Sequence, residues 1–232
     1  MSTTIEVNKQ SVKQFLETGK IKKFVIPEYQ RPYAWTDEQI QVLFDDLAEY
    51  TANNNESTYF LGSIVAYEND HNEQEIIDGQ QRITTLFLFL RAIYAKLENS
   101  CEKEALFLKS QIEPALWEQD DLTGEVKPDK ILIMSRVMGD EGNDEFASIL
   151  VSGKADVKSK TNYSKNYSLI QQLLNEYATN EPLSFYRFIS NILNKAILLP
   201  ITADTQDTAL TIFSTLNDRG LALSDADIFK AK

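Results

Sequence analysis

The stretch of residues 75–97 constrains the fold more than any other part of the chain. It opens with a short apolar run, Glu75-Ile76-Ile77, and continues with Asp78-Gly79, a pair that marks a sharp turn. From Ile83 onward, apolar residues recur at intervals of three and four, which is the spacing of one apolar helix face. The members of this series are Ile83, Leu86, Phe87, Leu90, Ile93, Tyr94 and Leu97. The stretch therefore predicts a strand, a tight polar loop and a helix, in that order.

The polar loop, Asp78-Gly79-Gln80-Gln81-Arg82, has the composition of an anion-binding site. Unpaired backbone N–H groups at a helix start carry partial positive charge and attract anions. Gly79 lets a ligand approach the backbone, and the forked guanidinium of Arg82 suits phosphate oxygens. A capped helix with a solvated Arg82 explains the same residues equally well, so the loop alone leaves both interpretations open.

A second informative segment, residues 27–35 (PEYQRPYAW), combines two prolines with flat aromatic side chains. The prolines keep it extended, because each one disfavours helix at the residue before it. Tyr29 and Trp35 offer faces that stack a base, while Gln30 and Arg31 offer planar polar ends for a phosphate. The alternative is a packing segment in which Arg31 pairs with a carboxylate, and composition alone favours that alternative.

Three ordered stretches resemble one known family. They are residues 26–47 (IPEYQRPYAWTDEQIQVLFDDL), residues 76–86 (IIDGQQRITTL) and residues 213–232 (FSTLNDRGLALSDADIFKAK). Together they are similar to the N-terminal domain of GmrSD-type DNA restriction endonucleases, a family related to the ParB/sulfiredoxin fold. The resemblance implies an α+β fold with a small mixed sheet, surrounding helices and a C-terminal helical subdomain. It also implies a nucleotide-binding, NTP-hydrolysing domain of a modification-dependent restriction or phage-defence protein.

The resemblance also assigns roles to residues. Asp78 and Arg82 are the expected catalytic residues, with Asp78 orienting water or a magnesium ion. The expected cofactor is an NTP with magnesium, because clustered phosphate charge needs a hard counter-ion. Nucleotide binding is expected from Gln30, Arg31, Gly79, Gln80, Gln81, Arg82, Thr84 and Thr85. Secondary candidates are Tyr29, Trp35, Asn217, Arg219 and Gly220, although an ordinary helix–turn–helix explains the last three without the resemblance.

Composition excludes several other functions. The net charge of −12 argues against a stand-alone DNA-binding surface, because phosphate contacts dominate DNA affinity. One histidine and one cysteine cannot build a zinc site, and the chain has no P-loop motif. The lone Cys101 and the lack of a long apolar run or leader predict a cytoplasmic protein without a membrane segment.

Two functional alternatives remain open at this stage. One is a module that binds a nucleotide or phosphate as a switch without hydrolysing it. The other is a ParB-like domain that cleaves DNA itself, against which the acidic charge and the missing His/Cys cluster argue. The expected partners are a nucleoside triphosphate and DNA, the latter through a nuclease domain or partner subunit outside this chain. Self-association stays open.

The chain is expected to divide into three parts. Residues 1–98 form the ParB-like nucleotide-binding subdomain, residues 99–165 a variable insertion of helices and loops, and residues 166–232 a helical subdomain with an NxxGxxL motif. A charged loop is expected at residues 120–130, after a helix interrupted near Pro114. No stop signal follows the last predicted helix, so a further domain is expected downstream.

Overall fold

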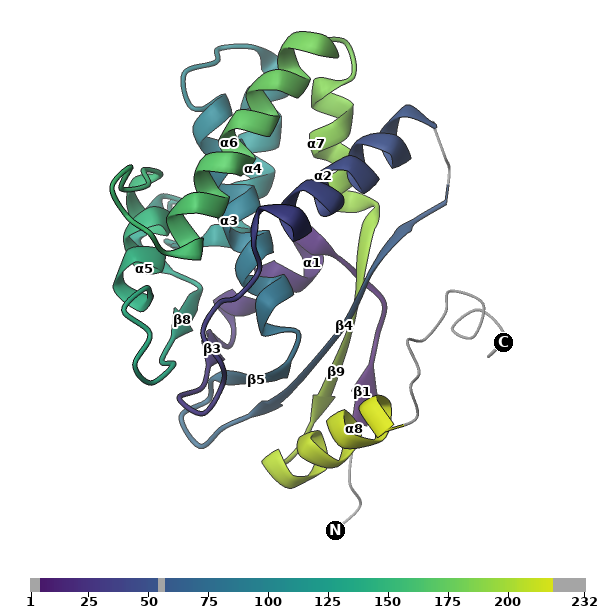
Figure 1. Ribbon diagram of the computed structural model, residues 1–232, viewed down its shortest axis with the longest axis vertical. Coiled ribbons are helices and arrows are strands. Elements are labelled where there is room, and N and C mark those ends of the chain that lie inside the picture. Colours follow the sequence, from purple (N-terminus) through teal and green to yellow (C-terminus); the bar gives the residue numbers. More distant parts are fainter. Residues whose placement is uncertain (1–4, 54–56, 219–232) are drawn as a thin grey trace.

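The computed structural model describes the backbone of residues 5–53 and 57–218, which form an α+β fold around one mixed sheet (Figure 1). The strands are β1 (Ile5–Val7), β2 (Gln10–Ser11), β3 (Phe24–Ile26), β4 (Tyr59–Glu68), β5 (Gln74–Asp78), β6 (Trp117–Gln119), β7 (Val126–Ile131), β8 (Ile133–Ser135) and β9 (Ala196–Ala203). The helices are α1 (Val12–Glu17), α2 (Asp37–Ala52), α3 (Gln80–Leu97), α4 (Lys103–Leu116), α5 (Asn143–Ser152), α6 (Asn162–Asn180), α7 (Phe185–Asn194) and α8 (Gln206–Asp218). The predicted α+β class is confirmed, whereas the ParB-like type stays a prediction.

The strand order of the main sheet is β1-β9-β4-β5-β3-β8, with β2 also pairing β9. The long strands β4 and β9 run parallel through its middle, from Tyr59 opposite Ala196 to Tyr67 opposite Ala203. β4 and β5 form an antiparallel hairpin. β3 lies parallel to β5 on the other side of β5. The segment of residues 27–35, which follows β3, therefore starts next to the strand that leads into the polar loop of residues 78–82.

Helix α3 is the central helix of the molecule. Its predicted apolar stripe is buried except for Tyr94, which is partly buried, and residues between the stripe positions, including Thr85, Leu88 and Phe89, are buried too. A helix that is buried on nearly all sides lies inside a core rather than on its surface. The prediction of one apolar face was therefore too narrow, because α4, α5 and α6 pack around α3 as well as the sheet.

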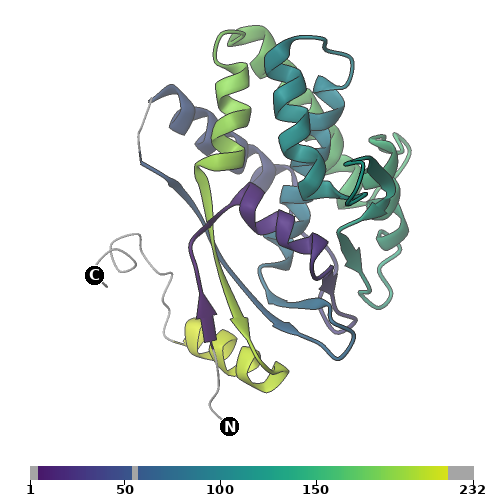
Figure 2. The same cartoon turned by 180° about the vertical axis from the view of Figure 1, so that it is seen from behind.

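The two faces of the sheet carry different helices. Most helices lie on one face, where α1 is in front of the strands in Figure 2, and their side chains share one large core with Ile64, Ile76 and Leu198. Helix α8 covers the other face, as Figures 1 and 2 show together. It packs on a smaller cluster formed by Val65, Ile77, Ile201, Ala203 and Ala209, with Ile212, Phe213 and Leu216 beside it.

Two local predictions were wrong. The stretch 120–130 is not all loop, because β7 (Val126–Ile131) pairs antiparallel with β6, which the buried Trp117 anchors in the core. Helix α4 continues through Pro114 to Leu116, since a proline in the last turn removes only one hydrogen bond. The strand β8 was missed because Ile133–Ser135 is too short to show a pattern.

The three parts expected from the sequence contribute to one sheet and one core. The large core contains Val12 and Leu90, Trp117 and Phe146, and also Leu198. Within the described ranges, no helix is long and apolar enough to cross a membrane.

Candidate functional site

The β5–α3 junction turns at Gly79, as the sequence predicted. Gly79 has φ 88°, a left-handed conformation that residues with a side chain rarely adopt. A Cβ atom there would lie 2.4 Å from Ile64 Cδ1 and 3.1 Å from the Ser63 carbonyl oxygen. Helix α3 begins at the next residue, and no side chain caps its first turn. The backbone N–H groups of that turn therefore remain available for a ligand.

Three glutamine amides fasten the segment of residues 30–35 to this junction. The Gln81 Oε1 atom accepts hydrogen bonds from the backbone N–H groups of Ala34 (2.6 Å) and Trp35 (3.2 Å), and its Nε2 donates to Pro32 O (3.2 Å). Gln80 Nε2 donates to the Arg31 carbonyl at 3.0 Å. From the opposite direction, Gln30 Nε2 donates to Ile77 O at 2.8 Å. These amides hold the segment of residues 30–35 against the β5–α3 junction.

A buried group of polar side chains holds the segment of residues 30–35 on its inner side. The hydroxyl groups of Tyr33 and Thr85 are 2.7 Å apart, and Asn166 on α6 donates to the Tyr33 hydroxyl and to Trp35 O. Burial raises the pKa of Tyr33 to about 12, so its hydroxyl stays protonated at neutral pH. Sequence reasoning missed Asn166, because its partners are far away along the chain.

Arg82 lies folded back over β4. Its Nη1 donates to the Ser63 carbonyl at 2.7 Å. Gly62, with φ 120°, leaves room for the guanidinium, since a Cβ atom there would lie 2.7 Å from Arg82 Cζ. Burial lowers the pKa of Arg82, and the negative charge of Asp78 opposes that shift. Among the described residues, no carboxylate lies within ion-pair distance of Arg82.

The segment of residues 30–35 and the β5–α3 junction line one open cleft of about 520 Å³. Arg31, which is exposed, and Arg82 both line it. Phe213 of α8 completes the lining, and sequence reasoning missed it as a site residue because it reads as one apolar position of an amphipathic helix. The lining residues are Gln30, Arg31, Trp35, Ile77, Asp78, Gly79, Gln80, Gln81, Arg82 and Phe213.

Some predicted site residues do not line this cleft. Thr84 and Thr85 are 2% and 0% exposed, and the Thr85 hydroxyl donates to Gln81 O. Tyr29 is exposed, and its hydroxyl bonds Glu75 and Gln206 instead. The Asn217 side chain, Arg219 and Gly220 lie outside the described residues.

A magnesium ion fits this cleft only as part of a ligand complex. Within residues 5–53 and 57–218, no group of three or more His, Cys, Asp or Glu side chains is placed to hold a metal. The cleft lining includes a single carboxylate, that of Asp78. Since magnesium binds through one or two carboxylates together with substrate phosphates, Asp78 would be the residue to hold it.

The mixed sheet thus presents the start of α3, which no side chain caps, and two arginine side chains in one cleft. Residues 12–232 match the family described as GmrSD restriction endonuclease, N-terminal domain, and the chain belongs to this family. No curated protein matches the chain.

Proposed function

We propose that the cleft binds the phosphates of a nucleoside triphosphate. The observation that carries the proposal is that Arg31, Arg82 and the uncapped start of α3 line one cleft. Neither guanidinium has a carboxylate within ion-pair distance in the described part of the chain. A polyphosphate would supply the missing negative charge, and a guanidinium matches phosphate oxygens with two donors.

The aromatic residues of the cleft provide a stacking surface for the nucleobase. Trp35 is the last residue of the segment that the glutamines hold, and Phe213 reaches the cleft from α8. Flat apolar rings stack on any nucleobase, so they add affinity without choosing the base. The cleft volume of about 520 Å³ lies in the usual range of small-molecule sites.

Hydrolysis is the second part of the proposal. Asp78 lies beside Arg82 at the cleft and has the chemistry to orient a water molecule toward the terminal phosphate. A bound magnesium ion would neutralise phosphate charge there. The non-hydrolysing alternative retains the same contacts, and a phosphate-release assay separates the two: release that Asp78→Asn abolishes supports hydrolysis, and no release supports a binding module.

The role in the cell follows from the family description, which names a restriction endonuclease. We place this chain in a DNA restriction or phage-defence protein, with NTP binding as its contribution. Its net charge of −12 disfavours broad phosphate contacts with DNA. DNA contact is therefore assigned to another domain or subunit, and a nicking assay on the purified chain should show no cleavage.

Replacing Arg31 with alanine tests the phosphate site. Loss of one charge-assisted contact should weaken NTP binding by about tenfold in isothermal titration calorimetry. The melting temperature should not change, because the Arg31 side chain is exposed and makes no hydrogen bond within the described structure. Arg187→Ala is the matched control, since it removes the same charge from an exposed position on α7. Equal NTP affinities for Arg31→Ala and the control would show that Arg31 does not contact the ligand.

A further inference from the structure

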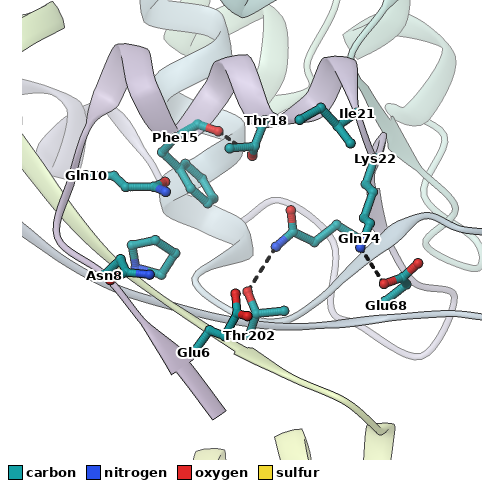
Figure 3. Close-up of a pocket in the computed structure, with 11 residues that line it drawn as sticks. Glu6, Asn8, Gln10, Phe15, Thr18, Ile21, Lys22, Glu68, Gln74 and Thr202 are labelled. Atoms are coloured by element: carbon teal, nitrogen blue, oxygen red, sulfur yellow. Dashed lines mark hydrogen bonds and ion pairs between the residues drawn. The ribbon is translucent and has the colours of Figure 1, made fainter. Parts of the chain in front are cut away.

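A second cleft, of about 300 Å³, lies between α1 and the sheet on the face opposite α8 (Figure 3). Side chains from α1, β1, β2, β5 and β9 point into it. It exists because the edge of the sheet is interrupted: β2 pairs with Leu198 and Ile197 of β9, β1 begins pairing at Ile201, and Pro200 lies between. Nothing in the proposed nucleotide site uses this cleft.

Three side chains around this cleft already donate to acceptors of the protein. The Lys22 ammonium pairs with Glu68, and Gln74 Nε2 donates to Thr202 Oγ1 at 3.4 Å, as Figure 3 shows. The Thr18 hydroxyl donates to the Phe15 carbonyl at 2.6 Å. One donor of each of these three side chains is therefore already in use.

Three acceptor groups at this cleft, in contrast, have no hydrogen-bond or ion-pair partner among the described residues. Gln10 Oε1 is buried and has no hydrogen-bond partner, which is costly for a native polar atom and calls for an explanation. The Gln74 side-chain oxygen points away from Thr202 toward α1, into the cleft (Figure 3). The Glu6 carboxylate lies beside Thr202 and makes no ion pair with any described residue.

We propose that this cleft binds a small organic cation that carries an ammonium or guanidinium group. Its donors would satisfy Gln10 Oε1 and the Gln74 oxygen, and its charge would pair with Glu6. The cleft also has an apolar wall, formed by Phe15, Ile21 and Pro200, against which an alkyl stem packs. An amphipathic cation matches both halves of the lining. The net charge of −12 raises the local concentration of such ligands.

Titration calorimetry with two probes tests the site on the purified chain. Spermidine represents a free polyamine, and N-acetylarginine amide represents an arginine side chain of a protein partner. We expect saturable binding of at least one probe, and Glu6→Gln and Gln10→Leu should each weaken it by about fivefold or more. The melting temperature of Gln10→Leu should be unchanged or higher, because the Oε1 atom makes no bond in the free protein.

The control is Glu141→Gln, which removes one charge from an exposed position in the loop before α5 and should leave probe affinity unchanged. Binding of spermidine alone identifies an ammonium site, and binding of the arginine derivative alone identifies a guanidinium site. The proposal is overturned if neither probe saturates. It is also overturned if Glu6→Gln and Gln10→Leu bind like the wild type, or if Glu141→Gln weakens binding as much as they do, since that would indicate general attraction to an acidic protein.

Discussion

Replacing Gln81 with leucine is expected to lower the free energy of unfolding by about 3 kcal/mol, at roughly 1 kcal/mol for each lost hydrogen bond. The Gln81 amide accepts from Ala34 N and Trp35 N and donates to Pro32 O, and it is only 8% exposed. Leucine fills a similar volume but leaves these three backbone groups without partners. For a chain of this size, the melting temperature should fall by about 6–12 °C, measured by scanning calorimetry.

The matched control for this substitution is Gln172→Leu. Gln172 lies on the exposed side of α6 and donates to Glu176 one turn later, at 2.8 Å. Its replacement should change the unfolding free energy by no more than about 0.5 kcal/mol. If Gln81→Leu were as mild as this control, the segment of residues 30–35 would be held by something other than the amides.

Gly62→Ala should weaken NTP binding by about ten- to a hundredfold, the loss expected for one charge-assisted contact. The added Cβ would lie 2.7 Å from Arg82 Cζ, so the guanidinium must leave its position over β4. The strained backbone at φ 120° adds a stability cost of about 1–3 kcal/mol. Calorimetric titration gives the affinity, and denaturant unfolding gives the stability.

Gly124→Ala separates backbone strain from displacement of Arg82. Gly124 also has a positive φ, of 69°, but a Cβ atom there would meet nothing within 4 Å. This control should cost some stability and leave NTP affinity unchanged. In the double variant Gly62→Ala with Arg82→Ala, part of the destabilisation should be relieved because the colliding group is gone. Unchanged affinity in Gly62→Ala would mean that the position of Arg82 does not matter to the ligand.

Features that depend on neighbouring residues were predictable from the sequence. The Asp78-Gly79 pair and the change from a short apolar run to helical spacing predicted the β5–α3 junction. The capping box of Thr36 and Gln39 at the start of α2 likewise depends on residues only three positions apart. In each case a few adjacent residues determine the backbone, so the pattern carries the information.

Features that depend on distant contacts were not predictable in the same way. The sequence suggested that Gln80 and Gln81 contact phosphate, but their amides bind the backbone of residues 31–35, a partner some fifty positions away. Phe213 lines the cleft only because β9 leads α8 onto the far face of the sheet. A glutamine looks the same in the sequence whether its amide binds a ligand or a backbone group. Only the fold decides between the two.

The central claim is that Arg31, Arg82 and the start of α3 hold the phosphates of one nucleotide. A crystal of the purified chain grown with magnesium and a non-hydrolysable NTP analogue tests it most directly. The account predicts phosphate density within hydrogen-bond distance of both guanidiniums and of the first N–H groups of α3, with the base near Trp35 or Phe213. Density for the analogue elsewhere, with this cleft filled by solvent alone, would contradict it.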